Sequence, residues 1–497
     1  MTGRSAAVLR ITREHGTLEL LEATASGLRA AFDRLVVVGD DAVARALDAE
    51  ALRLDELGSR LDGVELVLLA DDAWVGPLDD PNGWAPRRDA IAALVDHPGS
   101  WLLGHGAGAT RLLRGAGADA PPLHARQELD LLVRDAPIAP LDAFAAPPLE
   151  HDALGLVMPR VADVLAARGF PVDHVARSLA PVAMPRVLSS NLGLVEVVAE
   201  GRAVPRRPAL RIAVIMHVHY VEMLDELLER ADHLPPHRLV VTTSDAARGA
   251  ALEQRLVELG RIADVRVAES NRGRDISAFL IGCRDVLEDP ATDLVVKLHS
   301  KRSPQVGGMA GRSFAALLLD NLLPGPDHGA RLVDLFERDP RLGIAFPPMI
   351  HAWYPTLGRA WFTNRPDAEA LADRLGITTP LDDASPIAPY GSMFAARPDA
   401  LRPLLSGGID WSEFPDEGEY MDGSLAHVLE RLFVPAVLTQ GYSFRTVLSA
   451  RWAAMSHATL ELKLDAAEAS VERRIGRKVR RVPYKLGRVM RRVNPRR

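Results

Sequence analysis

The chain has 497 residues, of which 47% are hydrophobic and 25% charged, a balance typical of a soluble globular protein of two or three domains. Cys283 is the only cysteine, which excludes a disulfide framework and a cysteine-ligated zinc site. No stretch approaches 18 uninterrupted apolar residues, and the N-terminus lacks the basic start and apolar run of a signal peptide. We therefore expect a cytoplasmic protein.

The net charge of −7 is unevenly distributed along the chain. Residues 466–497 contain twelve Lys or Arg against two Glu, whereas the rest of the chain is acidic. An acidic body with a basic tail indicates that the tail has an anionic partner of its own.

Apolar, strand-like runs alternate with helical patterns along the chain, which predicts βαβ units and a largely parallel sheet. A helix is predicted near 157–169, and the polar, proline-bearing residues 201–209 are typical of a linker. The strand-like runs before this linker are residues 34–40, 64–72 and, more weakly, 100–105. Those after it are residues 210–220, 237–245, 263–270 and 293–300, followed by 342–348. The chain is thus predicted as an α/β protein with an N-terminal α/β domain (1–200), a second α/β domain (208–450) and a helical tail (451–497).

Polar segments follow all four strong strands of the second set: "MHVHY", "TTSD", "ESNRGRD" and "KLHSKRS". Ligands of open parallel sheets bind beyond the carboxyl ends of the strands. Four polar strand ends together therefore predict a site at this edge.

The segment "SNRGRDISAF" (270–279) has the features of a turn that approaches a ligand. Asn271 and Gly273 favour a tight turn, and Arg272 and Arg274 offer donors to phosphate. Asp275 and Ser277 are candidate caps for the helix that starts near Ile276. The alternative is a well-capped turn with solvated arginines. The spacing matches neither a P-loop nor a complete G-x-G-x-x-G motif.

In "DLVVKLHSKRS", alternation places Lys297, His299 and Lys301 on one face of a strand. The opposite face carries Leu294, Val296 and Leu298. Three cations aimed the same way suit a diphosphate leaving group, whose developing negative charge they would stabilise. The alternative is a strand end that emerges into solvent, although an unpaired ammonium at Lys297, inside the sheet, would be costly.

An acidic cluster precedes a probable helix at 423–433. It contains Glu417, Glu419 and Asp422, with His427 on the helix itself. A carboxylate near a helix start stays ionised and is a plausible general base toward a hydroxyl. Solvated acids at a helix start are also common.

These motifs, with "PYGSMFAARPDALRPLL", occur in the order seen in the rhamnan synthesis F family, which the chain resembles from about Leu210 to Phe444. Members of that family look like nucleotide-sugar glycosyltransferases of the GT-A type. The resemblance implies inverting transfer of a rhamnosyl group, from dTDP-L-rhamnose to a growing cell-surface polysaccharide on a lipid carrier. Transfer of another sugar stays open, and so does a non-catalytic assembly protein that binds nucleotide sugar or glycan.

The resemblance also implies roles for individual residues. Those implied in donor binding are His217, His219, Tyr220, Thr243, Ser244, Asp245, Asn271, Arg274, Asp275, Lys297, His299 and Lys301. Ser392 and Glu419 would lie on the acceptor side, Asp422 would be the base, and His427 would lie near the leaving group.

A divalent metal is not expected, and no other cofactor is implied. Lys-x-His-x-Lys stands where many GT-A enzymes have a metal-binding Asp-x-Asp, and positive charges repel a divalent cation. His299 leaves the alternative open, because imidazole binds transition metals.

The N-terminal set of strands is harder to interpret. "VELVLLADDAWVGPLDD", with Asp71, Asp72 and the Gly76–Pro77 turn, is similar to a pattern found upstream in some members of that family. We expect a GT-A-like domain with reduced or no activity; an acceptor-binding platform is the alternative.

The tail, residues 471–497, repeats apolar residues between basic ones, at Val479, Val482, Leu486, Val489 and Val493. Such helices lie in the interface of anionic membranes, so we expect a peripheral protein on the inner face of the cell membrane. Nucleic acid is not expected as a partner, because the body is acidic.

Overall fold

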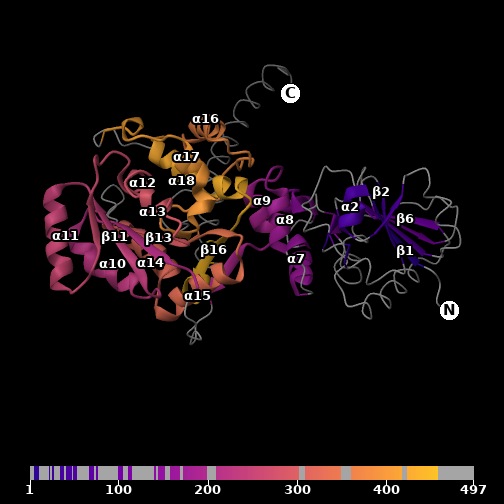
Figure 1. Ribbon diagram of the computed structural model, residues 1–497, viewed down its shortest axis with the longest axis horizontal. Helices are drawn as coiled ribbons and strands as arrows, with labels where there is room; N and C mark the ends of the chain where they lie inside the picture. The colour runs from indigo at the N-terminus through magenta and orange to yellow at the C-terminus, as the bar shows by residue number, and fades with distance from the viewer. Residues whose placement is uncertain are drawn as a thin grey trace, which may run out of the picture.

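The structure is a computed structural model (Figure 1). It describes, apart from a few single residues, the ranges 5–10, 34–38, 41–47, 49–52, 66–71, 74–75, 99–103, 110–114, 139–140, 144–151, 157–167, 172–198, 209–300, 308–348, 360–416 and 423–456.

The larger of two main sheets has eight strands in the order β12-β11-β10-β13-β15-β14-β16-β9. In chain order they are β9 (Val195–Val198), β10 (Ile212–His217), β11 (His237–Thr243), β12 (Asp264–Val267), β13 (Leu294–His299), β14 (Leu342–Phe346), β15 (Phe394–Ala396) and β16 (Ser443–Ser449). Strand β15 is antiparallel to both of its neighbours, and every other pairing in the sheet is parallel. All the strands except β15 therefore end at the same edge.

Both faces of this sheet are covered, which explains why its strands are runs of apolar residues rather than alternating ones. On one face, Val214, Val296 and Leu298 belong to a core shared with four helices, namely α10 (Leu224–Ala231), α11 (Ala246–Glu258), α14 (Gly308–Leu322) and α15 (Pro326–Arg338). On the other face, Ile215 and Val295 belong to a second core.

The second core collects helices from distant parts of the chain. Five helices that follow β12 in the chain contribute to it: α12 (Arg274–Leu280), α13 (Arg284–Leu287), α16 (Arg365–Leu375), α17 (Arg402–Ser406) and α18 (Leu425–Thr439). Helices that precede the sheet also contribute: α7 (Val157–Ala167), α8 (Val172–Leu179) and α9 (Pro185–Asn191). Figure 1 shows α8 and α9 beside the larger sheet. The described residues between 144 and 198, which the sequence analysis grouped with the N-terminal domain, thus pack with the larger sheet and supply its edge strand β9.

The smaller sheet has six strands in the order β3-β2-β1-β4-β7-β6. They are β1 (Ser5–Arg10), β2 (Arg34–Val38), β3 (Glu50–Leu52), β4 (Leu66–Asp71), β6 (Gly99–Leu103) and β7 (Thr110–Arg114). Strands β1 to β4 pair in parallel, and β7 is antiparallel to β4 and β6. Helix α2 (Asp41–Ala46) follows β2, and β5 (Trp74–Val75) pairs with β8 (Ala139–Pro140). The predicted α/β class is confirmed.

The structure reproduces the predicted strands of both sets and adds others. Strand β15, antiparallel within an otherwise parallel sheet, departs from the predicted pattern. The linker at 201–208 and the tail from 461 on lie outside the described residues, and the proposed domain limits stay predictions. Within the described ranges, no helix has both the length and the apolar character needed to cross a bilayer.

Candidate functional site

The site is built on a change of direction in the larger sheet. From β10, the chain adds β11 and then β12 on one side, and then places β13 on the other side of β10. In open α/β sheets, this kind of switch point leaves a crevice beyond the carboxyl ends of the two central strands. Here the central strands are β10 and β13, and their last residues, His217 and His299, are register partners. The predicted strand-end residues are therefore brought to one place.

Hydrogen bonds join the ends of β10 and β11 on one side of the crevice. His217 Nδ1 lies 3.0 Å from Thr242 Oγ1, and Thr243 Oγ1 donates to the Val218 carbonyl at 2.7 Å. One residue further out, His219 Nδ1 lies 3.1 Å from Ser244 Oγ. Burial lowers the pKa of His217 to about 3, so this imidazole is neutral at neutral pH and adds no positive charge to the crevice.

Asp245 and Arg248, at the start of helix α11, hold the loop that follows β10 in place. Asp245 caps the helix by accepting from the Arg248 backbone N–H at 2.9 Å, and the two side chains form an ion pair. Arg248 Nε donates to the His219 carbonyl at 2.9 Å. Asp245, predicted to face a ligand, thus also fixes the start of α11.

Ser300 ties the end of β13 to the loop after β10. Its Oγ accepts from the backbone N–H groups of His219, at 2.9 Å, and Tyr220, at 3.1 Å. The rings of His219 and Tyr220 meet edge to face with centroids 5.0 Å apart. Ser300 was missed as a site residue, although it stands inside the quoted "KLHSKRS" segment. The sequence feature that could have identified Ser300 is its position, one residue after a strand that ends at the switch point.

Lys297 lies in an environment that the sequence analysis did not anticipate. Its side chain is 1% exposed, and the ammonium contacts Asp275 Oδ2 at 2.5 Å, the Ser392 carbonyl at 2.9 Å and Ser392 Oγ at 3.3 Å. An ammonium has three hydrogens to donate, and these acceptors use them all. Lys297 therefore does not face solvent as a free cation, and we assign it the role of holding Asp275 and Ser392 in place.

Asp275 is the anion at the centre of this network. Ser392 Oγ also donates to its Oδ2, and His299 Nε2 lies 4.0 Å from the same oxygen. Burial by itself would raise the pKa of Asp275, but His299, Lys297 and the hydrogen bonds hold that pKa well below its ordinary value. The carboxylate is ionised at neutral pH. The expectation that Asp275 caps helix α12 is wrong, because the N-cap is Gly273 and no side chain caps the helix.

Ser392 and Arg274, the residue before Asp275, have a backbone conformation that non-glycine residues rarely adopt. Arg274 has φ 54° and Ser392 has φ 52°, and each follows a glycine with positive φ, Gly273 at 74° and Gly391 at 83°. Such residues cost about 1–3 kcal/mol each and are found mostly at functional sites. The predicted tight turn at Asn271–Gly273 is confirmed, and a second one lies at Gly391–Ser392.

The Gly391–Ser392 turn is fixed from two further sides. His299 Nε2 lies 2.6 Å from the Gly391 carbonyl, so this nitrogen donates. The Gly391 backbone N–H donates at 2.8 Å to Glu430 on helix α18. His427, one turn earlier on α18, contacts Ser424 Oγ at 3.0 Å through Nδ1. Helix α18 thus joins the site through Glu430.

Several predicted site residues cannot be placed. Lys301, Glu419 and Asp422 lie outside the described residues. Among the residues that are described, no group of three or more His, Cys, Asp or Glu side chains is arranged to hold a metal ion.

Together the topology and the site define a mixed α/β protein with a cluster of polar side chains at the switch point of its larger sheet. The sequence profile of the family described as "Rhamnan synthesis protein F" matches residues 131–442. The chain belongs to this family. The matched range includes helices α7 to α9 and strand β9, which supports their place with the larger sheet.

The chain is also similar to "Uncharacterized protein WxcX" of Xanthomonas campestris pv. campestris, strains B100 and ATCC 33913, with 35% identity over 236 residues in each case. The match covers 47% of this chain and spans about a third (32%) of each relative. Among solved structures, the glycosyltransferase GlyE of Streptococcus pneumoniae TIGR4 aligns over 61% of this chain and 87% of its own, with 12% identity and a TM-score of 0.18. This last likeness is too remote to support a conclusion.

Proposed function

We propose that the chain is a glycosyltransferase that moves a rhamnosyl group from dTDP-L-rhamnose to a growing cell-surface polysaccharide, with inversion. Membership of a family described by rhamnan synthesis supports a role in making such a polymer. The observation that carries the proposal is the register pairing of His217 with His299 at the switch point, which brings the polar ends of β10, β11 and β13 together at one edge of the sheet. Nucleotide ligands of open α/β sheets bind in this position.

The described side chains suit the nucleotide part of the donor. Ser244 and the ring of Tyr220 stand on the β10–β11 side of the crevice, where a hydroxyl and an aromatic face can contact a nucleoside. Arg274 lies in the strained turn beside Asp275 and is a donor that phosphate accepts well. Lys301 follows Ser300 by one residue and is the nearest cation along the chain for the diphosphate.

The transfer step needs a base on the acceptor side. In the proposed reaction, an acceptor hydroxyl oxygen attacks the anomeric carbon, the bond from that carbon to the diphosphate oxygen breaks, and dTDP leaves with the electron pair. Asp422 takes the proton of the attacking hydroxyl, and Glu419 and Ser392 line the acceptor side. His427 lies two residues into α18 and is proposed to stabilise the leaving group. No step in this scheme uses a metal ion.

The partners of the reaction follow from its product. A growing surface glycan is carried on a lipid, so we propose that the basic tail holds the chain on the inner face of the membrane, next to the acceptor. The N-terminal domain is proposed to be a relative of the transferase domain with reduced or no activity.

Calorimetric titration with dTDP-L-rhamnose, UDP-glucose and GDP-mannose, first with magnesium and then with EDTA, tests the donor. We expect binding of dTDP-L-rhamnose alone, unchanged by EDTA, and weakened about tenfold in Ser244→Ala. Ser406→Ala, an exposed helical serine that bonds only its own helix, is the matched control and should bind normally. Binding that EDTA abolishes would show a metal-dependent site.

A transfer assay with radiolabelled donor then separates enzyme from assembly protein. Asp422→Asn should keep donor binding and lose turnover at least a hundredfold. A wild-type chain that binds the donor but transfers nothing to purified lipid-linked glycan would favour the assembly protein.

A further inference from the structure

Phe362 combines two unusual features on the surface of the protein. Its φ is 51°, so that Phe362, Arg274 and Ser392 are the three non-glycine residues with positive φ in the described part of the chain. A bulky side chain rarely tolerates this conformation, and residues strained in this way are found mostly at functional sites. Phe362 is also 48% exposed, so the strain does not serve to bury its ring in the core. An aromatic ring held at the surface against its backbone preference requires an explanation.

The turn that carries the ring, residues 360–364, is fixed on both sides of Phe362. Before the ring, Trp361 is buried and its Nε1 donates to the Asp382 carbonyl at 2.6 Å. After the ring, Asn364 is buried, and its Nδ2 donates to the Trp361 carbonyl at 2.8 Å. Because the backbone is already held, little conformational entropy is lost when a ligand meets the ring.

This turn lies beside helix α18, next to the acceptor side of the proposed reaction. Asn364 Oδ1 accepts from the Gly423 backbone N–H at 3.1 Å, and Gly423 directly follows the proposed base, Asp422, in the sequence. On the helix itself, Arg431 Nε donates at 3.1 Å to the carbonyl of Ala360, at the start of the turn. Both ends of the turn are therefore tied to α18 and the residue before its N-cap.

The strained turn at Gly391–Ser392, on the acceptor side, is held by the same part of α18. Glu430 accepts from the Gly391 backbone N–H at 2.8 Å. The guanidinium of Arg431, the next residue, lies over the Tyr390 ring at 5.6 Å from its centroid. Ala360 and Tyr390 also belong to one small buried cluster. The two turns are therefore neighbours, joined through adjacent residues of α18.

An exposed phenyl ring beside the acceptor side suits a sugar as its ligand. The face of an aromatic ring packs against the C–H groups of a sugar ring, while the sugar hydroxyls stay in water. The alternative is insertion into a membrane, but acidic residues outnumber basic ones around this turn, which disfavours an anionic lipid surface. The segment 360–383 has four exposed acidic residues and two arginines, namely Asp367, Glu369, Asp373 and Asp383 with Arg365 and Arg374.

We propose that the ring of Phe362 is a platform that binds one sugar residue of the acceptor glycan. The inference rests on the proposed function, because the assignment of Ser392 and Asp422 to the acceptor side identifies the ligand. Phe362 contacts the acceptor and takes no part in the making or breaking of bonds. Since the ring makes the same contact before and during transfer, its loss weakens acceptor binding and leaves the chemical step unchanged.

Transfer kinetics on the full chain test this role. With radiolabelled dTDP-L-rhamnose and purified lipid-linked glycan, Phe362→Leu should raise the KM for the glycan at least fivefold, while kcat and the KM for the donor change less than twofold. Phe362→Tyr keeps the ring and should stay within twofold of the wild type. Ile262→Ala, at an apolar residue that is 96% exposed in the loop before β12, is the matched control and should have no effect. An unchanged KM for the glycan in Phe362→Leu, or a change in the KM for the donor alone, overturns the proposal.

Direct binding separates a failure of the platform from a failure of the proposed transfer. Calorimetric titration with an α-linked L-rhamnose trisaccharide should show binding to the wild type and to Phe362→Tyr, and binding at least fivefold weaker in Phe362→Leu. The platform is overturned if the wild type does not bind the trisaccharide, or if Phe362→Leu binds it normally. A wild type that binds the trisaccharide through Phe362 but transfers no sugar would contradict the proposed function and leave the platform standing.

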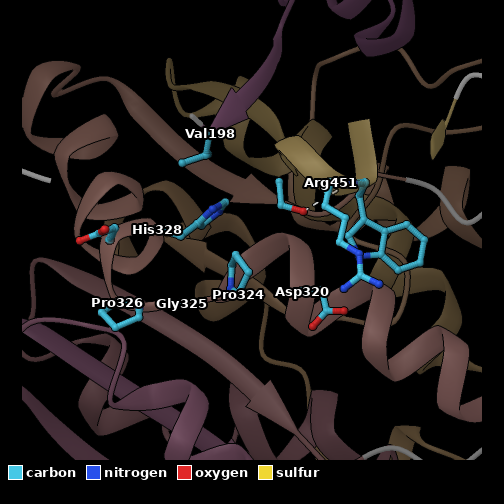
Figure 2. Close-up of a pocket in the computed structure, with 10 residues that line it drawn as sticks. Val198, Asp320, Pro324, Gly325, Pro326, His328 and Arg451 are labelled. Carbon is cyan, nitrogen blue, oxygen red and sulfur yellow. Dashed lines mark hydrogen bonds between the residues drawn. The ribbon is translucent and has the colours of Figure 1, made fainter. Parts of the chain in front are cut away.

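Two further measurements exclude other sites for the same effect, and a urea titration checks that each variant is folded. Arg451 lines a cavity of about 340 Å³ beside Val198 and Ser449, the ends of β9 and β16 (Figure 2). Arg451→Ala should bind the trisaccharide normally, and a loss as large as that of Phe362→Leu would place the sugar in this cavity instead. Vesicles of phosphatidylcholine and phosphatidylglycerol should sediment with Phe362→Leu as with the wild type. Loss of vesicle binding together with normal trisaccharide binding would make the ring a membrane contact and overturn the proposal.

Discussion

The ammonium of Lys297 and the carboxylate of Asp275 lie 2.5 Å apart, with the Lys297 side chain 1% exposed and the Asp275 side chain 16% exposed. The phenyl rings of Phe279 and Phe394 flank the ammonium, with centroids 5.7 and 6.0 Å from Nζ. Burial pulls the pKa of Lys297 down, and Asp275 pulls it up. The pair therefore stays charged only as long as both members are present, which makes the Ser392 turn and helix α12 depend on each other.

Removing one member of this pair should strongly destabilise the chain. Lys297→Met keeps most of the side-chain volume but leaves Asp275, whose side chain is 16% exposed, without its cation, and we expect a loss of about 3 kcal/mol in the free energy of unfolding. Urea denaturation measures it. The exposed pair Arg211–Asp293 is the matched control, and Arg211→Met should cost about 1 kcal/mol or less. The double variant Lys297→Met/Asp275→Leu should recover most of the loss, and equal losses in the single and double variants would contradict this assignment.

Acid should destabilise the chain through His217. The pKa of His217 is lowered to about 3 in the folded chain, against about 6.5 when it is unfolded. Between these values the unfolded state binds the extra proton, so the stability that this group contributes is present above pH 6.5 and is lost as the pH falls. At pH 5 the loss should be about 2 kcal/mol.

Comparing wild type with His217→Gln at pH 7 and pH 5, by urea denaturation, isolates this effect. The variant cannot take up the proton, so its stability should fall by about 2 kcal/mol less than that of the wild type over this interval. His237→Gln, at a partly exposed histidine at the start of β11, is the control and should fall as far as the wild type. Parallel pH dependence in wild type and His217→Gln would rule the explanation out.

Ser300→Ala should loosen the loop after β10 without unfolding the chain. The His219 and Tyr220 N–H groups lose their acceptor, so their hydrogen exchange should become at least tenfold faster, and the affinity for the nucleotide donor should fall about tenfold. Exchange measured by mass spectrometry and calorimetric titration provide the two readouts. Unchanged exchange together with unchanged affinity would show that this hydroxyl does not organise the crevice.

The turn before α12 should not tolerate a side chain. Gly273 has φ 74°, and a Cβ there would lie 2.5 Å from the Phe414 ring, so Gly273→Ala should cost about 3 kcal/mol, from backbone strain and overpacking together. Gly376 has a similar φ of 67° but open space around it, so Gly376→Ala should cost about 1 kcal/mol. Thermal unfolding distinguishes the two, and equal costs would mean that the contact with Phe414 is unimportant.

Local patterns were sufficient to predict the parallel strands and the edge that carries the site. The runs at 210–220, 237–245 and 293–300 became β10, β11 and β13, and the alternation through Lys297 placed it on the face opposite to Leu298, as the two cores confirm. Both signals come from neighbouring residues, so they can be read from one sequence.

What escaped prediction depends on contacts between distant residues. The partner of Lys297 lies 22 residues away at Asp275, and the Ser392 carbonyl 95 residues away, so no local pattern indicates that the ammonium is neutralised. Strand β15 has only three residues, too few for a periodic pattern. The cavity of about 340 Å³ beside the ends of β9 and β16 is lined by residues as distant in the sequence as Val198 and Trp452, and no motif marks it.

The pairing of β9 with β16 also has a consequence for the order in which the chain is made. Val195–Val198 leaves the ribosome long before Ser443–Ser449, its neighbour in the sheet. Until β16 emerges, β9 has no strand to pair with. The edge of β14 at Ile344 and Phe346 also stays without its partner strand. Sheets that close by such distant pairings form slowly and expose open edges meanwhile. The edge that β16 covers therefore stays open to aggregation until residue 449 has left the ribosome.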